Sequence, residues 1–300
     1  MKNKGILYGI VAYTLWGLLP IYWKALETVP AIEILSHRMV WSFFFMIAVL
    51  AVKRHWGWIR PVLQQPKVLL TFLVTAVLLS INWFTYIWGV NNGYIVETAL
   101  GYFINPLVNV LLGFIFLQER LRKGQVLAVL LALGGVVYLT ITYGALPWIA
   151  LTLAFSFAFY GLLRKTAALN SLEGLSLETA WLFLFALGGL IYFELQGTGA
   201  FGHGALSTNM LLIGAGVVTA VPLLFFAASA RRVTMATVGI LQYLAPTLQF
   251  LLGVFIYGED FSRTQLIGFS FIWLALLVYT AESFRHNGRL ARRKVENPLL

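Results

Sequence analysis

The sequence lacks cysteine altogether and contains a single aspartate, Asp260, among its 300 residues. The absence of thiols excludes disulfides, thiolate metal sites and thiol nucleophiles. A lone aspartate in a loop excludes a Ser-His-Asp triad and the aspartate-rich metal sites of membrane prenyl transferases. The four histidines are scattered, and neither H-E-x-x-H nor the phosphate-binding G-x-x-x-x-G-K-[ST] motif occurs. We therefore predict no enzyme, with no catalytic residue, no metal site, no cofactor and no use of ATP within this chain.

Charged residues are also scarce. Only 11% of the residues are charged, 60% are hydrophobic and the mean hydropathy is +0.84, a balance that soluble globular chains of this length do not reach. The chain is therefore expected to lie in membrane lipid, where its 13 Tyr, 10 Trp and 23 Phe suit interfacial belts and helix packing. The net charge of +10 does not indicate a nucleic-acid partner, because the basic residues separate apolar runs instead of clustering on one soluble face.

Apolar runs of membrane-spanning length divide the chain into ten predicted helices. About 20 apolar residues cross the hydrocarbon core as a helix. Cutting at charges and turn residues gives the segments 5–23, 31–52, 68–90, 95–117, 124–141, 146–163, 175–193, 209–229, 236–257 and 264–281. The first run resembles a signal peptide, but it is long enough to span and no cleavage site follows, so we expect an uncleaved helix. The uncharged stretch 124–163 is too long for one helix, and Gly144 and Pro147 predict a hairpin within it.

The distribution of Lys and Arg predicts the orientation, because cytoplasmic loops hold the excess of these residues. With the N-terminus inside, 18 of the 21 fall in cytoplasmic segments, Lys24 and Arg263 fall outside, and Arg38 lies within a helix. Both termini are therefore predicted to be cytoplasmic. Adding or removing one helix would reverse every later loop and destroy the asymmetry, so the charges also favour ten helices.

Residues 97–140 match residues 237–280 at a spacing of 140 without a gap. The register superimposes residues that rarely match by chance: Pro106 on Pro246, Gly113 on Gly253, Glu119 on Glu259, and Gln125 on Gln265. Each copy holds five helices, an odd number, so the second copy inserts upside down relative to the first. We predict an all-α membrane protein with a 5+5 inverted repeat, its halves at 1–143 and 144–284 and a basic cytoplasmic tail at 285–300. Such repeats are typical of secondary transporters with a site near the midplane.

The second predicted helix carries three ionisable residues, Glu33, His37 and Arg38, where such groups are costly unless they face a cavity or a partner. On a functional interpretation Arg38 binds an acceptor on the substrate, and His37 and Glu33 supply protonation-linked coupling, with Trp41 on the same helix face. The alternative is a structural ion pair of Arg38 with Glu33 or Glu97. The two interpretations carry equal weight at this stage.

A second carboxylate, Glu178, follows Glu33 by 145 residues and so falls near the equivalent place in the inverted half. It is a further candidate for coupling. Its predicted position near the start of the seventh helix favours a solvated glutamate instead.

Further polar and aromatic residues are expected to line a cavity, although each amide taken singly can also join two helices. Pro106 and Pro246 are predicted to kink the fourth and ninth helices, as proline does where the backbone lines protein or a water-filled cavity. The other candidates for substrate binding are Asn82, Trp83, Tyr102, Asn105, Gln242 and Tyr243.

Over residues 5–285 the sequence resembles the EamA type of the drug/metabolite transporter superfamily. The motifs that carry the resemblance are E-I-L-S-H-R at 33–38, N-W at 82–83, L-G-Y-F-I-N-P-L at 100–107, F-S-F-A-F-Y-G at 155–161, and Q-Y at 242–243 with P-T-L at 246–248. The usual glycine before the helix-end glutamate is present at Gly258 but is Gln118 in the first half. The resemblance implies ten helices, cytoplasmic termini and export of small organic molecules, and it supplies neither a substrate nor site residues.

We therefore expect a multi-pass protein of the bacterial inner membrane that transports small organic metabolites or drugs by alternating access, coupled to protons or to nothing. A facilitative channel or uniporter and a membrane sensor that does not transport are the alternatives. The expected partners are the small-molecule substrate and membrane lipid. The sequence leaves open whether the protein is a monomer or a homodimer.

Overall fold

The computed structural model describes residues 2–118, 121–230, 232 and 241–296, and these residues form helices and loops without a strand. The helices are α1 (Lys2–Gly17), α2 (Leu19–Lys24), α3 (Ala31–Lys53), α4 (Ile59–Leu63), α5 (Pro66–Asn91), α6 (Ile95–Leu117), α7 (Lys123–Tyr143), α8 (Trp148–Thr166), α9 (Ser171–Leu195), α10 (Leu206–Ala230), α12 (Leu244–Leu251), the π-helical turn η1 (Leu252–Ile256) and α13 (Arg263–Glu296). Among the described residues, eight helices are long and apolar enough to cross a membrane, and two further apolar helices are shorter, Trp148–Arg164 and Leu244–Ile256.

The exposed side chains of this bundle are those of a protein surrounded by lipid. Large apolar residues such as Phe185 and Phe255, each 73% exposed, point away from the bundle. Helices are the expected form for such a chain, because each backbone N–H and C=O in hydrocarbon must be paired within its own segment. The chain is therefore a multi-pass membrane protein.

Most predicted segments coincide with helices, but the first is interrupted at Leu18, and α9 and α13 differ from their predicted ends by four residues or more. The hairpin predicted between 142 and 147 is confirmed, since α7 ends before Gly144 at φ 66° and α8 begins after Pro147. Helix α9 begins at Ser171, four residues earlier than predicted, where the side chains of Asn170 and Glu173 form a capping box. Helix α13 continues to Glu296, so the backbone of the predicted tail is helical that far. The first part of the predicted helix 236–257 and the last residues, 297–300, lie outside the described residues.

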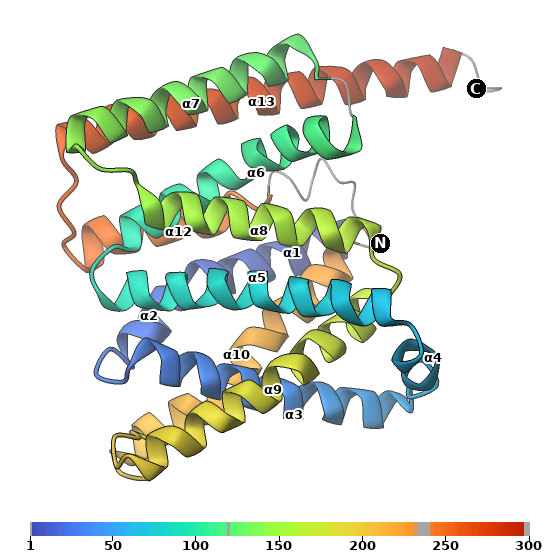
Figure 1. Ribbon diagram of the computed structural model, residues 1–300. Helices are drawn as coiled ribbons and strands as arrows, with labels where there is room; N and C mark the ends of the chain where they lie inside the picture. The colour runs from blue at the N-terminus through green and yellow to red at the C-terminus, as the bar shows by residue number, and fades with distance from the viewer. Residues whose placement is uncertain (1, 119–120, 231, 233–240, 297–300) are drawn as a thin grey trace.

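The helices lie in a flattened bundle with α7 and α13 side by side along one edge (Figure 1). Next come α6 and α8 with α12, then α5 and α1, and finally α3, α9 and α10. Many packed pairs join helices from the two predicted halves, among them α3 with α9, α6 with α12, and α7 with α13.

Two clusters of buried side chains hold the bundle together. The first cluster packs α2, α3 and α5 against α9 and α10 and includes Trp23, Ile34, Trp83 and Leu212. The second cluster joins α6, α7, α8 and α13 through residues such as Phe103 and Phe269. Helix α8 belongs to both clusters, because Leu153 packs in the first and Ala154 in the second.

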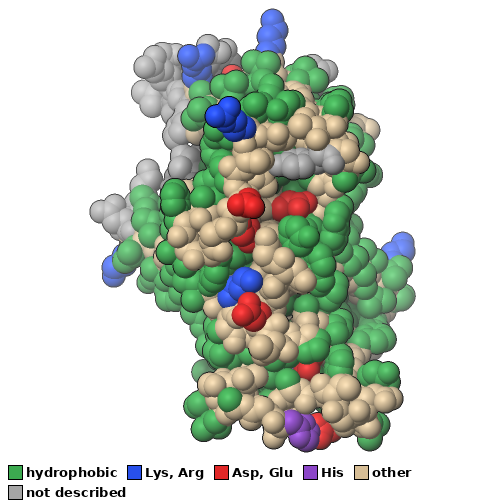
Figure 2. All heavy atoms as spheres, turned by 90° about the vertical axis from the view of Figure 1, so that its left-hand side faces the viewer, with side chains coloured by type: hydrophobic (Ala, Val, Ile, Leu, Met, Phe, Trp, Pro, Cys, Tyr) green, Lys and Arg blue, Asp and Glu red, His purple; other side chains and the backbone are tan. Residues whose placement is uncertain are grey.

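One end of the bundle is richer in carboxylates than in basic groups. Figure 2 looks onto the end that carries the loops 25–30, 92–94, 144–147, 196–205 and 257–262, and acidic side chains gather across its middle between apolar flanks. The Glu259 carboxylate at this end accepts hydrogen bonds of 2.7 Å from the N–H groups of Ile95 and Val96 at the start of α6. Burial raises the pKa of Glu259 above its ordinary value, and these donors oppose the shift.

Helices α3 and α10 approach closely because Gly216 has no side chain. A Cβ atom there would lie 2.5–2.7 Å from the backbone of Trp41, closer than any relaxed contact allows. We expect Gly216→Ala to lower the free energy of unfolding by about 1–3 kcal/mol, the usual range for overpacking. Gly188→Ala in α9 is the matched control, because nothing lies within 4 Å of its Cβ position. Thermal unfolding of the purified variants checks this, and equal midpoints for both variants would contradict the close approach.

Candidate functional site

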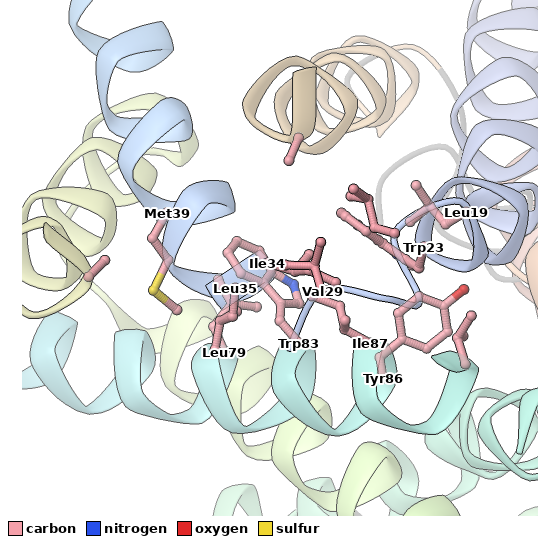
Figure 3. Packing of buried hydrophobic residues seen from close by; sticks show 14 of the residues in the cluster. Leu19, Trp23, Val29, Ile34, Leu35, Met39, Leu79, Trp83, Tyr86 and Ile87 are labelled. Carbon is pink, nitrogen blue, oxygen red and sulfur yellow. The ribbon is translucent and has the colours of Figure 1, made fainter. Parts of the chain in front are cut away.

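The side chain of Arg38 is buried in the centre of the bundle and is 4% exposed. Its Nε donates a hydrogen bond of 2.8 Å to Thr219 Oγ1 on α10. The guanidinium carbon lies 3.9 Å from the ring centre of Trp83 on α5 and 5.2 Å from that of Trp23 on α2. Figure 3 shows Trp83 and Tyr86 rising from α5 toward the helices that carry Ile34 and Trp23. Cation–π contacts contribute about 0.5–2 kcal/mol each, so they offset only part of the penalty for burying the charge.

No carboxylate among the described residues forms an ion pair with Arg38, and its Nη1 has no hydrogen-bond partner there. Glu33 is engaged elsewhere, because its Oε1 accepts hydrogen bonds of 2.7 and 3.3 Å from the backbone of the 200–201 loop. Glu97 interacts with backbone N–H groups in the first turn of α8. The structure therefore does not form the ion pair of Arg38 with Glu33 or Glu97 that was one interpretation of the sequence.

Other buried polar groups lie around Arg38. Trp23 Nε1 has no hydrogen-bond partner among the described residues, and the Tyr86 hydroxyl interacts with the Gln249 side chain. The Tyr86 side chain faces both Arg38 and the Gln249 amide. Gln249 itself is held in place, since its Nε2 donates a hydrogen bond of 3.1 Å to the Trp16 carbonyl. Each unpaired buried polar group costs about 1–3 kcal/mol, so a concentration of them is typical of a binding site and unusual in a core that only packs.

Three of the predicted cavity residues instead join helices. Asn82 Nδ2 donates to the Leu153 carbonyl at 3.0 Å, and Asn105 Nδ2 donates to the Ala154 carbonyl at 3.0 Å. The Tyr102 hydroxyl donates to Asn82 Oδ1 at 3.2 Å. These side chains fasten α5 and α6 to α8 by interhelical hydrogen bonds. Tyr102 remains an electrostatic neighbour of Arg38 and so contributes a wall of the site.

His37 and Trp41 lie on a different side of α3 from Arg38. Trp41 Nε1 donates to His37 Nδ1 at 3.3 Å, and the His37 ring lies 4.8 Å from that of Phe201. His37 Nε2 is 4.0 Å from Glu33 Oε1. Glu33, His37 and Trp41 therefore form a group of their own beside the 200–201 loop.

Glu178 is completely buried, which corrects the expectation of a solvated glutamate near a helix start. Because α9 begins at Ser171, Glu178 lies two turns inside the helix. Its Oε1 accepts a 2.7 Å hydrogen bond from Thr75 Oγ1 and lies 3.8 Å from Arg164 Nη1, and its Oε2 lies 3.4 Å from the Tyr160 hydroxyl. The Glu178 carboxylate and the Arg164 guanidinium thus link α5, α8 and α9.

The remaining predicted residues do not reach Arg38. Tyr243 packs against the second cluster, and Gln242 beside it is half-buried. Pro106 lies inside the continuous helix α6, whereas Pro246 lies in the first turn of α12, where proline removes no helical hydrogen bond. The two prolines match in sequence but occupy different positions in their helices.

Sequence reasoning missed three residues of the Arg38 site, Thr219, Tyr86 and Trp23. Tyr86 follows Trp83 by three residues, one helical turn, and this spacing was a usable signal. Thr219 and Trp23 reach Arg38 only through tertiary packing, so nothing in the local sequence marks them.

The arrangement favours binding over chemistry. A guanidinium, two indole rings, a phenol and an amide lie close together here, and these groups can hold an anionic or acceptor group next to an aromatic or apolar body. Within the described ranges no three His, Asp or Glu side chains gather as a metal site would need.

Comparison with known proteins adds the family context. The EamA-like transporter family matches residues 3–141 and again residues 146–281. Protein RarD of Escherichia coli K12 is 46% identical over 290 residues, which cover 97% of this chain and 98% of the relative. An uncharacterized transporter of Bacillus subtilis, YojE, is 49% identical over 283 residues, 93% of this chain and 94% of the relative.

A more distant relative, the chloramphenicol-sensitive protein RarD of Pseudomonas aeruginosa, is 33% identical over 300 residues, 98% of this chain and 99% of its own. A protein of known crystal structure superposes with a TM-score of 0.59 at 20% identity and covers 93% of this chain and 97% of its own. At that identity the superposition shows a shared fold and nothing more.

Proposed function

The chain belongs to the EamA-like transporter family, and from this premise we propose that it moves small organic molecules across the bacterial inner membrane by alternating access. The family and the names of its relatives make it a membrane transporter. The mechanism, the substrate class and the direction of transport are proposals that rest on the geometry of the Arg38 site.

In this proposal ten membrane segments form two inverted halves, 1–143 and 144–284. The segments are α1 with α2, α3, α5, α6, α7, α8, α9, α10, α12 with η1, and α13. The two matches to one family support this division. It is also supported by the packed pairs α3 with α9, α6 with α12 and α7 with α13, because each pair joins segments five apart.

The observation that carries the proposal is the buried guanidinium of Arg38 at the junction of the halves. It forms no ion pair with a carboxylate among the described residues. Helices α3 and α5 of the first half supply Arg38, Trp83 and Tyr86, and α10 and α12 of the second supply Thr219 and Gln249. If the halves rock against each other, these groups part and meet again, so the site faces each side of the membrane in turn. Without a bound partner the buried charge is costly, which favours a substrate with an anionic or acceptor group.

We propose that Glu178 couples transport to protons. It is a buried carboxylate held by Arg164 and Thr75, and a proton is the ligand that would release it from Arg164. The direction we propose is export.

Metabolite release tests the proposal without requiring that the substrate be chosen beforehand. A strain with a chromosomal deletion of the gene is given either a plasmid that encodes the wild-type protein or the empty vector. Cells that express the protein are expected to enrich a small set of compounds in the medium relative to cells with the empty vector. The enriched compounds are expected to combine an anionic or strong acceptor group with an aromatic or apolar body. Identical media from both strains, at verified levels of membrane-inserted protein, would contradict the proposal.

The absence of cysteine makes the orientation directly testable. Leu146→Cys lies in the loop between α7 and α8 and Gln64→Cys in the loop between α4 and α5, and both positions are exposed. With both termini cytoplasmic, a maleimide that cannot cross the membrane is expected to label Leu146→Cys in spheroplasts and Gln64→Cys only after lysis. The few basic groups at the end shown in Figure 2 support this orientation. The reverse labelling pattern would contradict this orientation and place both termini outside the cell membrane.

A further inference from the structure

A cavity lies between α3 and α9 and is separate from the Arg38 site. Its volume is about 430 Å³, and the 199–203 loop closes one side. Adjacent residues of a helix project about 100° apart, so His37 lines this cavity while Arg38 points to Thr219 and Trp83. Small-molecule sites span roughly 300–1,000 Å³, so the volume suits one small organic ligand.

Two buried polar side chains have unpaired atoms at this cavity. Glu33, 1% exposed, and His37, 3% exposed, both line it. Glu33 Oε1 is fixed by the loop backbone, but Oε2 has no partner among the described residues, and neither has His37 Nε2. His37 Nδ1 accepts a hydrogen bond from Trp41 Nε1, and the neutral ring therefore carries its own proton on Nε2. Both atoms are enclosed at the wall of the cavity, so a ligand that parts the side chains covering them meets one carboxylate acceptor and one imidazole donor.

The remaining lining is apolar and acidic. Val40, Leu190, Ile191 and Phe201 supply apolar walls, and Glu194 adds a second carboxylate at the mouth, 3.0 Å from His203. The lining contains no Lys or Arg. Ile191 is 52% exposed on the outer face of α9, so the cavity borders the surface that faces lipid.

We propose that the α3–α9 cavity is a binding site for an amphipathic organic ammonium ion. The ammonium group donates to Glu33 Oε2, the apolar body lies between Trp41, Phe201 and Leu190, and Glu194 attracts the cation at the mouth. Cation–π contact with the aromatic walls adds to the binding. The ligand differs in charge from the anionic or acceptor group that suits Arg38, so the two sites select different compounds. This inference goes beyond the proposed transport function and does not depend on it.

Equilibrium dialysis of radiolabelled 2-phenylethylammonium against the purified full-length protein tests the site. We expect saturable binding near one ion per chain. Phenylacetate and 2-phenylethanol, the anionic and neutral analogues, are expected to compete at least tenfold more weakly. Equal competition by all three would show partition into detergent or apolar surface and would overturn the proposal.

Variants locate the site. Glu33→Gln keeps an oxygen for the 200–201 backbone and is expected to weaken binding at least tenfold. Ile191→Trp, at an exposed position, keeps both carboxylates and is expected to block the cavity. Glu27→Gln removes a carboxylate at the same end of the bundle but outside the cavity and is expected to bind normally. Arg38→Gln is also expected to bind normally. Loss in Arg38→Gln with retention in Glu33→Gln and Ile191→Trp would place the cation in the central site and contradict the proposal.

Discussion

Arg38→Met is expected to abolish release of the transported compounds while leaving the folded protein at least as thermally stable as the wild type. Truncating a buried charged contact to a ligand costs about 2–5 kcal/mol, which corresponds to a loss of roughly 30- to 3,000-fold in affinity at 1.4 kcal/mol per factor of ten. Methionine follows the same path through the bundle without a charge. The folded state then no longer buries a guanidinium without an acid partner, and replacing buried ionic groups by apolar ones is often neutral or stabilising.

The combination of lost transport and kept stability separates a binding role from a structural one. Thr219 Oγ1 keeps its own hydrogen bond of 2.8 Å to the Ala215 carbonyl, so the substitution leaves no hydroxyl proton unpaired. Arg38→Lys is the conservative comparison, because lysine keeps the charge but loses the planar stack on Trp83 and the Nε contact. A large fall in the unfolding temperature of Arg38→Met would show that Arg38 is structural, and normal release would remove it from the site.

Glu178→Ala is expected to cause the largest loss of stability among single carboxylate substitutions, about 1–3 kcal/mol, because it leaves Arg164, whose side chain is 15% exposed, without its partner. It also removes one of the two acceptors near Thr75 Oγ1 and leaves the Phe72 carbonyl at 3.0 Å. Glu27→Ala is the control, since its pair with Lys24 is exposed and such pairs contribute at most about 1 kcal/mol. Thermal unfolding of purified variants measures both effects.

A double-mutant cycle identifies the origin of that loss. If the unpaired guanidinium causes it, Glu178→Ala combined with Arg164→Met is expected to be more stable than Glu178→Ala alone. Should Glu178→Ala unfold at the same temperature as Glu27→Ala, the buried network would carry no stability and Glu178 would have no place in coupling.

The sequence predicts the membrane helices well because hydropathy and Lys/Arg placement are local signals. The length of a membrane-spanning helix is set by the thickness of the bilayer. Gly144 and Pro147 mark a helix end irrespective of the packing around them. The predicted start of α9 is wrong because Ser171, Glu173 and Gly174 look like loop residues. In the structure they belong to a capped helix that extends beyond its apolar core.

The binding residues are predictable only in part, since residue type does not tell which neighbour a side chain meets. The sequence groups Glu33, His37 and Arg38, but neighbouring positions on α3 face different partners: Arg38 meets Thr219, whereas Glu33 and His37 line the α3–α9 cavity. Asn82 and Asn105 are buried polar groups, yet both donate hydrogen bonds to carbonyl groups of α8. Thr219 comes from the other half of the chain, and only tertiary packing brings it to Arg38.

Counterflow in proteoliposomes tests the central claim, alternating access at the Arg38 site, most directly. The labelled compound is the one most enriched in the medium of expressing cells. Vesicles preloaded with the unlabelled compound are expected to take up the labelled one faster than empty vesicles, with saturation, and vesicles with Arg38→Met to show neither effect. Uptake that rises linearly with concentration and ignores preloading would contradict alternating access and indicate a channel.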